Sequence, residues 1–220
     1  MKKLIIFDLD GTLLNTIADL AQATNQALQQ YNYSTHDVES YRFMVGNGIN
    51  KLFERALPDS ERTTRNILKI RESFLAYYDK HNADLTTPYE GIEILLDTLQ
   101  KQGYMLAVAS NKYQAATSKL IEKYFPQIHF CEVYGQRENI PAKPSPQVVE
   151  TIMQSTCTTA DEVVYIGDSD VDMMTGKNAK VTTVGVSWGF RPRTELEQHN
   201  PSFIADKAAD IWEFIRKMNE

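Results

Sequence analysis

The stretch LIIFDLDGT, residues 4–12, joins a short apolar run to two aspartates, a glycine and a threonine. Four consecutive apolar residues are typical of a strand that is buried on both faces of a parallel sheet. Asp8 and Asp10 then stand at the carboxyl end of that strand, and Gly11 allows a sharp turn directly after them. The stretch therefore predicts a buried strand that delivers two carboxylates to one edge of a sheet.

The same pattern recurs along the chain, where further apolar runs end in Asp, Ser or Gly and helical patterns lie between them. The predicted strands cover residues 4–10, 105–110, 130–135, 162–168 and 181–187. The predicted helices between and after them include residues 113–124, 146–154, 170–179 and 208–218. Strands that alternate with helices predict an α/β fold with a doubly wound parallel sheet.

Residues 16–81 hold no convincing strand and show three amphipathic helical patterns instead. These patterns cover residues 16–31, 35–57 with an interruption at Gly46-Asn47-Gly48, and 59–81. A helical insertion directly after the first strand predicts a separate small domain. We expect a core domain of residues 1–15 and 83–220 and an all-helical cap domain of residues 16–82, hinged near residues 13–16 and 82–88.

Composition and charge argue against several classes of partner. Of the 220 residues, 42% are hydrophobic and 24% are charged, and the net charge is −6. Nucleic acids and anionic membranes bind cationic surfaces, which this acidic chain does not favour. No apolar stretch approaches the roughly 20 residues of a membrane span. We expect a cytoplasmic protein, a monomer or homodimer, with no nucleic-acid or membrane partner.

Polar groups gather at the predicted strand ends. Because the carboxyl ends of parallel strands meet at one crevice, Asp8 and Asp10 should lie near residues from three later segments. These residues are Ser110 with Asn111 and Lys112, then Lys143, and Asp168 between Gly167 and Ser169. Each alone is more often a helix cap or a solvated loop residue, but together, in separate segments of one sheet, they indicate a functional site.

These residue types suit phosphoryl transfer. A carboxylate such as that of Asp8 can attack phosphorus and form an acyl-phosphate, which splits one difficult hydrolysis into two easier steps. The phosphate dianion repels the carboxylate, so the site needs positive charge. We expect Mg²⁺ on hard oxygen ligands, with Asp8 and Asp168 as candidates, and Lys143 beside them.

The remaining groups have distinct expected roles. The Ser110 hydroxyl and backbone N–H groups near Thr12 and Asn111 can bind phosphoryl oxygens. Asp10 follows Asp8 by two residues and so shares its face of the strand. It can protonate a basic leaving group and then take a proton from the attacking water.

Four motifs, in this order, resemble the signatures of the haloacid dehalogenase superfamily: DLDGT at 8–12, SN at 110–111, KPSP at 143–146 and GDSDVD at 167–172. The resemblance implies a Rossmann-like core with Asp8 as nucleophile and Asp10 as acid/base. It implies Mg²⁺ held by Asp8, the Asp10 carbonyl and Asp168, and phosphate bound by Ser110 and Lys143. Asp172 matches an acidic residue that supports the metal ligands from behind.

Three further stretches resemble the phosphoglycolate phosphatases within this superfamily: residues 45–57, 184–192 and 201–211. The resemblance implies a hydrolase for a small phosphorylated metabolite, with a helical cap that contacts the organic end of the substrate. We expect that contact at Asn47 and Gly48, with Asn47 also capping the helix that follows. Two features depart from the family pattern: Asn15 replaces a common Asp, and residues 134–144 lack the usual acidic loop.

Other functions share parts of this pattern. A sugar-phosphate mutase like β-phosphoglucomutase would use the same catalytic residues and remains an alternative. A response-regulator receiver domain also places aspartates, Mg²⁺ and a lysine at strand ends, but it is about half as long and lacks a helical insertion. Dehalogenation is disfavoured because a halide needs no acid such as Asp10, and a protein that only binds a metabolite would not need Asp10.

Overall fold

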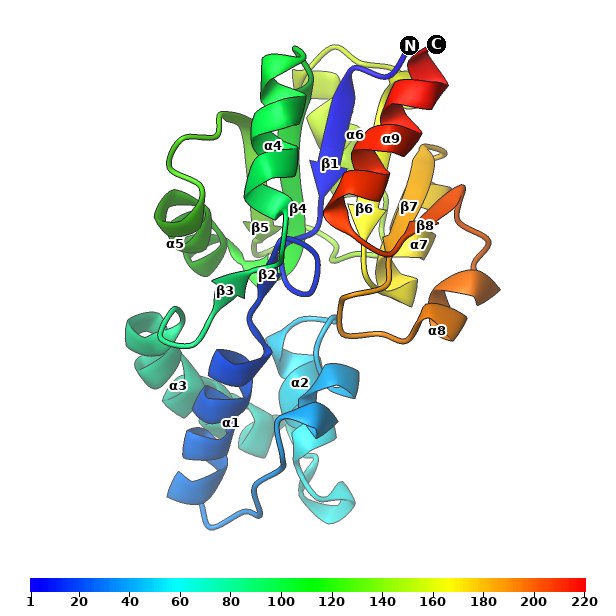
Figure 1. Ribbon diagram of the computed structural model, residues 1–220. Helices are drawn as coiled ribbons and strands as arrows, with labels where there is room; N and C mark the ends of the chain where they lie inside the picture. Colours follow the sequence, from blue (N-terminus) through cyan, green and yellow to red (C-terminus); the bar gives the residue numbers. More distant parts are fainter.

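The computed structural model describes residues 1–220 as a parallel six-stranded sheet between two layers of helices, with a helical unit at one end (Figure 1). The strand order is β5-β4-β1-β6-β7-β8. The strands are β1 Leu4–Phe7, β4 Met105–Tyr113, β5 Phe130–Gln136, β6 Val163–Gly167, β7 Thr182–Val186 and β8 Phe203–Ala205. β1 pairs in parallel with both β4 and β6. The doubly wound α/β fold is thus confirmed.

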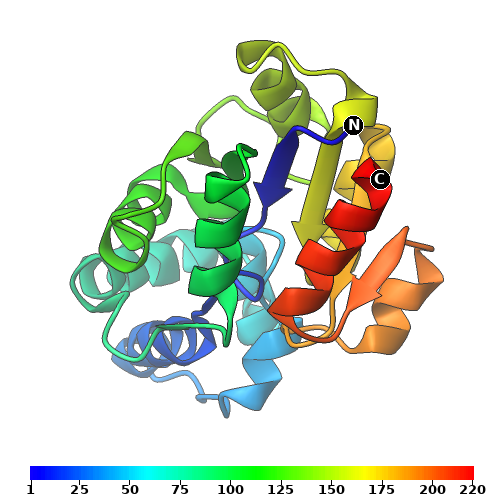
Figure 2. The same cartoon turned by 45° about the horizontal axis from the view of Figure 1, so that its top comes forward.

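Side chains of β1 alternate between two apolar layers, and all four are fully buried. Ile5 and Phe7 join the layer formed with α4, α5 and α9, whereas Leu4 and Ile6 join the layer formed with α6. Burial of each such side chain contributes about 1.5–3 kcal/mol. The helices are α4 Ile92–Lys101, α5 Gln114–Tyr124, α6 Gln147–Ser155, α7 Asp170–Asn178, α8 Arg193–Gln198 and α9 Ala208–Asn219. Figure 2 shows α4 and α9 across the same face of the sheet.

The helical unit lies beyond the carboxyl ends of the strands (Figure 1). Its elements are α1 Ile17–Gln30, the 3₁₀ turns η1 Glu39–Phe43 and η2 Asp59–Glu61, α2 Ile49–Ala56 and α3 Thr64–His81. A separate apolar cluster holds it together, and Ala116 and Phe190 of the sheet unit join that cluster. The division into residues 1–15 with 83–220 and residues 16–82 agrees with these clusters but stays a prediction.

Two connections link the helical unit to the sheet, and they pair with each other. β2 Leu14–Asn15 runs antiparallel to β3 Thr87–Pro88. Asp19, in the first turn of α1, is buried and accepts hydrogen bonds from the backbone N–H of Leu85 (3.0 Å) and from the N–H and hydroxyl of Thr86 (2.8 and 2.7 Å). This carboxylate therefore ties the start of the first cap helix to the returning connection.

Several elements differ from the sequence-based expectation. α4, α8 and β8 were not among the predicted elements, although the apolar residues of α4 recur at helical spacing. β8 has three residues and reads as a strand only through its pairing with β7. The first part of the predicted helix over 35–57 is the 3₁₀ turn η1. The interruption at 46–48 is confirmed, because α2 begins after Gly48.

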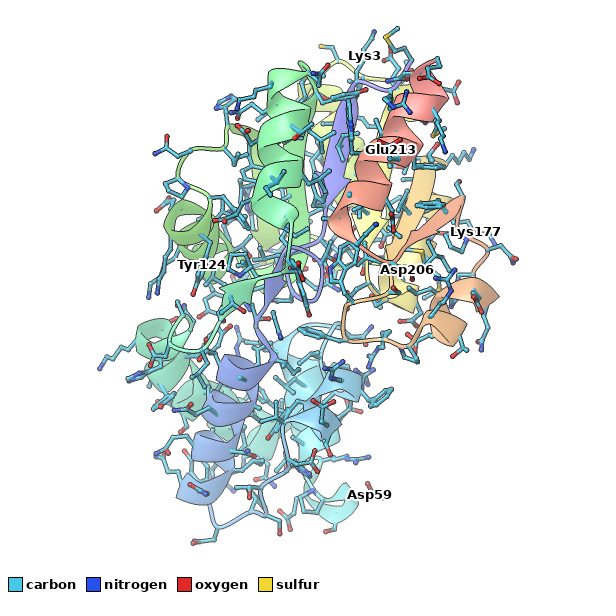
Figure 3. All side chains as sticks on the ribbon, in the orientation of Figure 1. Lys3, Asp59, Tyr124, Lys177, Asp206 and Glu213 are labelled. Atoms are coloured by element: carbon cyan, nitrogen blue, oxygen red, sulfur yellow. The ribbon has the colours of Figure 1, made fainter.

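Charged side chains spread over the outside of both units, for example Asp59 at the far end of the helical unit and Lys177 in the last turn of α7 (Figure 3). They are solvated, and surface ion pairs of this kind contribute little to stability. None of the helices combines the length and the apolarity that crossing a bilayer requires.

Candidate active site

The turn after β1 brings Asp8 and Asp168 close together. The Asp8 N–H donates to the Ile166 carbonyl of β6 at 2.9 Å, which anchors the strand end. Gly11 follows with φ +84°, and a Cβ there would lie 2.2 Å from Asp168 Oδ2. Only glycine allows this backbone to pass so close to the second carboxylate.

Lys143 lies between two carboxylates. Its Nζ is 2.9 Å from Asp8 Oδ1 and 2.7 Å from Asp172 Oδ1, and it also donates to the Ala109 carbonyl at 3.0 Å. The side chain is 3% exposed. Each of the three ammonium protons of Lys143 can donate to one of these partners. Lys143 therefore holds Asp8 in one place and offsets part of the charge of the Asp8 carboxylate.

Asp172 is saturated with hydrogen bonds, which leaves Asp8 and Asp168 as the available metal ligands. Asp172 Oδ1 accepts hydrogen bonds from Lys143 Nζ and the Tyr165 hydroxyl, and Oδ2 accepts one from Ser169 Oγ at 2.7 Å. One carboxylate oxygen from each of Asp8, Asp168 and Asp172 lies within 4.8 Å of the others. Oxygen donors of this type, close together and buried, fit Mg²⁺.

Burial raises the pKa of Asp8 from 3.8 to about 7; Lys143 opposes that shift, and the neighbouring charges of Asp172 and Asp10 add to it. The pKa of Asp168 also lies well above its ordinary value, through burial and the charges of Asp172 and Asp8. Three carboxylates therefore share one lysine. A divalent cation would supply the missing positive charge.

The raised pKa of Asp8 gives a pH-dependent stability in chelator. Between pH 3.8 and about 7 the folded protein binds more protons than the unfolded chain, so its stability falls as the pH rises through this window. Metal-free protein should melt roughly 2–5 °C lower at pH 8 than at pH 6. Thermal melts in EDTA should show this difference in the wild type and much less of it in Asp8→Asn. Equal differences in both proteins would contradict the assignment of this pH dependence to the raised pKa of Asp8.

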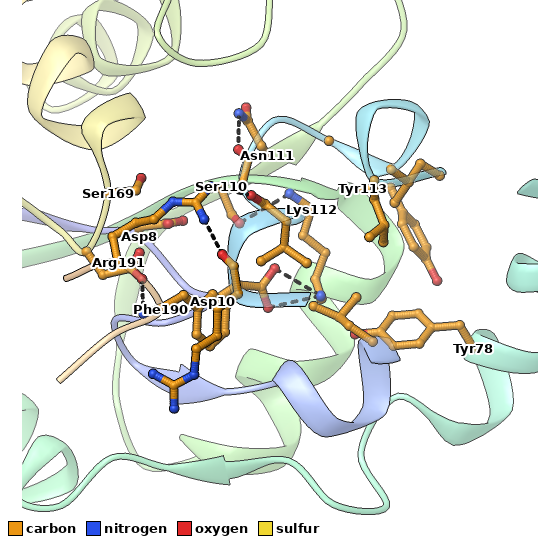
Figure 4. A pocket seen from close by; sticks show the side chains of 18 residues that line it. Asp8, Asp10, Tyr78, Ser110, Asn111, Lys112, Tyr113, Ser169, Phe190 and Arg191 are labelled. Carbon is orange, nitrogen blue, oxygen red and sulfur yellow. Dashed lines mark hydrogen bonds and ion pairs between the residues drawn. The ribbon is translucent and has the colours of Figure 1, made fainter. Parts of the chain in front are cut away.

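Asp10 lies on the cap side of Asp8 (Figure 4). Its carboxylate accepts from the Thr16 hydroxyl at 2.6 Å, and both of its oxygens lie 3.0 Å from Lys112 Nζ. The Asp10 side chain is 19% exposed and lines the same pocket as Asp8. The two aspartates predicted to share a face therefore open onto one space.

That pocket lies between the sheet edge and the helical unit, with about 630 Å³ of empty space, part of it open to solvent. Hydrogen bonds join the helical unit and the sheet unit across this pocket, with donors on both sides. Arg191 donates to the carbonyls of Arg42 and Val45, Arg42 donates to the Gly189 carbonyl, and Asn111 donates to the Gly46 carbonyl at 2.9 Å. The loop after β7 and the loop before α2 are thus held together over the pocket.

The structure brings most of the predicted site residues together. The pocket is lined by Asp8, Asp10, Gly48, Ser110, Asn111 and Asp168. Lys143 and Asp172 lie behind this lining, where they support Asp8 and each other. Asn111 also positions Lys143, because its amide bonds the Lys143 backbone N–H and carbonyl at 2.9 and 3.1 Å.

Thr12 and Asn47 lie outside the pocket lining. Thr12 is fully buried and its N–H bonds the Leu9 carbonyl, as a part of the turn. The expectation that Asn47 caps the following helix is wrong. Gly48 takes the cap position, and Asn47 Oδ1 accepts from Arg55 Nη2 at 2.8 Å instead, because Gly48 with φ +82° redirects the chain.

Pocket residues that were not predicted from the sequence include Arg42, Tyr78, Phe190 and Arg191. Lys112 was predicted at the strand end together with Ser110 and Asn111, but without a role of its own, and it does line the pocket. Phe190 matters through its backbone, because its N–H donates to Asp168 Oδ2 at 2.6 Å. No local pattern marks a backbone donor of this kind.

Known proteins resemble the chain along its full length. The profile of the haloacid dehalogenase-like hydrolase family matches residues 5–186. The phosphoglycolate phosphatase of Vibrio parahaemolyticus serotype O3:K6 is 31% identical over 97% of this chain and 96% of its own length. That of Psychrobacter arcticus is 29% identical over 98% of this chain and 96% of its own.

A crystal structure of a candidate phosphoglycolate phosphatase from Lactobacillus delbrueckii subsp. bulgaricus matches with a TM-score of 0.92 at 32% identity, covering 98% of this chain and 99% of that one. A second structure, from Haemophilus somnus, matches with a TM-score of 0.90 at 28% identity, covering 97% and 98%. The profile match and the full-length relatives show that this chain belongs to the haloacid dehalogenase-like hydrolase family, in which it is a phosphatase similar to the phosphoglycolate phosphatases.

Proposed function

We propose that the protein is a Mg²⁺-dependent phosphatase that hydrolyses a small phosphate monoester through a phospho-aspartyl intermediate on Asp8. The observation that carries this proposal is the geometry of two aspartates on one turn. Asp8 is paired with Lys143 at 2.9 Å, and Asp10 opens onto the same pocket without contacting that lysine. Different partners suit the two carboxylates to different roles.

In the first step, a carboxylate oxygen of Asp8 attacks phosphorus, and the bond to the leaving oxygen breaks. Asp10 donates its proton to that oxygen, so an alcohol leaves and Asp8 carries the phosphoryl group. In the second step, Asp10 takes a proton from water as the water oxygen attacks phosphorus. The bond between phosphorus and Asp8 breaks, which releases phosphate and restores both carboxyl groups.

The chain supplies the remaining parts of this chemistry. Asp8, the Asp10 carbonyl and Asp168 would hold Mg²⁺, which offsets the negative charge of the phosphate when bound. Lys143 keeps the attacking carboxylate in position, and the Ser110 hydroxyl lies in the pocket as a donor for a phosphoryl oxygen. The Phe190 N–H fixes one oxygen of Asp168.

The substrate proposed here is a small phosphorylated metabolite like phosphoglycolate. Relatives that cover 97% and 98% of this chain are named phosphoglycolate phosphatase, and cap residues such as Gly48 and Leu52 line the same pocket as Asp8. We propose that the cap closes over the substrate, excludes water and contacts its organic end at the loop of Gly48.

The direct test is hydrolysis of a chromogenic aryl phosphate and of 2-phosphoglycolate by purified protein. Both should turn over with Mg²⁺, and neither should turn over in EDTA. β-Glucose 1-phosphate in the same assay distinguishes a mutase, because it would give glucose 6-phosphate without release of phosphate. No turnover of any phosphate ester with Mg²⁺ would overturn the proposal.

Asp10→Asn should slow the first step for alkyl phosphates far more than for activated aryl phosphates. An aryl oxide can leave without a proton, whereas the alkoxide of glycolate cannot, and general acid catalysis contributes about 10²–10⁴-fold. Rapid-quench measurement of the phosphorylation step separates this effect from the second step, which should slow for both. Equal loss with both leaving groups in the first step would contradict Asp10 as the acid.

A further inference from the structure

Lys112 is a buried ammonium in the pocket wall. Its side chain is 3% exposed, it follows Ser110-Asn111 at the end of β4, and it lines the same pocket as Asp8. The only hydrogen-bond partners of its Nζ are the two oxygens of Asp10, each at 3.0 Å. Because an ammonium has three protons, a single carboxylate does not exhaust its capacity to donate.

Tyr78 of α3 lies directly beside it. Lys112 Nζ is 5.0 Å from the centre of the Tyr78 ring, and Tyr78 lines the pocket too (Figure 4). Tyr78 is fully buried and its hydroxyl has no hydrogen-bond partner. A buried hydroxyl without a partner is costly, so its presence in a pocket wall calls for a partner supplied from outside the chain.

The other cations of the pocket join its two sides. Arg191 donates to the Arg42 and Val45 carbonyls and pairs with Glu195 at 3.3 Å. Arg42 lies 2.8 Å from Glu39 and donates to the Gly189 carbonyl, although its buried Nε has no hydrogen-bond partner. These two guanidinium groups hold the two loops together, and Lys112 is the cation that contacts Asp10.

We infer that Lys112 and Tyr78 together bind an anionic group on the leaving-group part of the substrate. This inference rests on the proposed phosphatase function, because Asp10 marks where the leaving oxygen lies. A carboxylate one carbon away from that oxygen would sit beside the two oxygens of Asp10, within the space that Lys112 and Tyr78 border. The Lys112 ammonium donates to one oxygen of the substrate carboxylate, and the Tyr78 hydroxyl donates to the second.

The inferred pair explains selectivity by charge. Three acidic side chains, Asp8, Asp10 and Asp168, line the pocket together with Arg42 and Arg191. Lys112 is the cation in contact with Asp10, so without it an anionic leaving group would have no cation at that position. The apolar and aromatic surroundings from Leu20, Leu52 and Tyr113 strengthen a charged hydrogen bond there. A neutral ester of the same length would leave the Tyr78 hydroxyl unpaired and bind more weakly.

The test compares 2-phosphoglycolate with ethyl phosphate, which has the same two-carbon length and no carboxylate, in kcat/KM with saturating Mg²⁺. The wild type should prefer 2-phosphoglycolate. Lys112→Met should reduce that preference about 100-fold and Tyr78→Phe about 10-fold, mainly through KM for 2-phosphoglycolate. Lys112→Arg should keep part of the preference.

Tyr78→Phe is the decisive variant, because it keeps the ring and removes a hydroxyl that has no hydrogen-bond partner in the chain. Lys69→Met is the matched control: Lys69 also lies over a tyrosine ring, that of Tyr31, but it is exposed and outside the pocket. It should leave the preference unchanged.

The outcomes separate this inference from the proposed function. If the wild type hydrolyses neither these two esters nor the aryl phosphate, the phosphatase proposal itself fails; if it hydrolyses the aryl phosphate alone, the anion site is overturned. If it hydrolyses both without preference, or if Lys112→Met and Tyr78→Phe slow both esters in parallel, the phosphatase proposal stands and the anion site is overturned. In the latter case, the two residues would act only through Asp10 and packing.

Discussion

Asp8→Asn should abolish turnover of every phosphate ester, by about 10⁴-fold or more, while the protein stays folded. The amide has nearly the shape of the carboxylate but is a poor nucleophile. Lys143 keeps its contact with Asp172 at 2.7 Å and with the Ala109 carbonyl in this variant, so the substitution does not leave a buried charge without a partner.

A trapping experiment makes this prediction specific to the covalent step. Rapid acid quench of wild type with a ³²P-labelled substrate should leave label on the protein, and Asp8→Asn should take up none. Circular dichroism and thermal melts check that the variant is folded. A fresh preparation of Asp8→Asn is first checked for deamidation by mass spectrometry. If it retains more than about 5% of the wild-type activity, Asp8 is not the nucleophile.

Removal of divalent metal should stop the reaction completely, and added Mg²⁺ should restore it. Asp8 and Asp168 are buried carboxylates with raised pKa values, and without a cation they repel a phosphate dianion. Ca²⁺ should restore little activity, because its larger and more flexible coordination would misplace the attacking oxygen.

Asp168→Ala should raise the Mg²⁺ concentration needed for activity at least about 100-fold or prevent rescue altogether. Asp59→Ala provides the control, since Asp59 is 89% exposed at the far end of the helical unit. Isothermal titration of both variants with Mg²⁺ measures binding without relying on turnover. An unchanged Mg²⁺ affinity in Asp168→Ala would mean that the metal is held elsewhere.

Short apolar runs in the sequence were enough to predict much of the fold. The apolar runs at β1, β4 and β6 predict buried strands because each strand is covered on both faces and so lacks polar alternation. Because parallel strands share one carboxyl edge, the same runs predict that Asp8, Ser110 and Asp168 lie in one pocket, as they do. α4 and β8 were not predicted: β8 is too short to show a period, and its pairing with β7 defines it.

The order of residues is enough to predict the fold class, the edge of the sheet where the site lies, and the two aspartates on one turn. The partners of each charged group follow only from the way the folded chain packs. Lys112 and Tyr78 come from two units of the chain and meet across the pocket, Asn47 turns to Arg55 rather than to its helix, and Asp172 is saturated by Lys143, Tyr165 and Ser169. Hydrogen bonds reach about 3 Å, so these partnerships depend on how distant segments pack, and a linear pattern of residue types does not contain that distance.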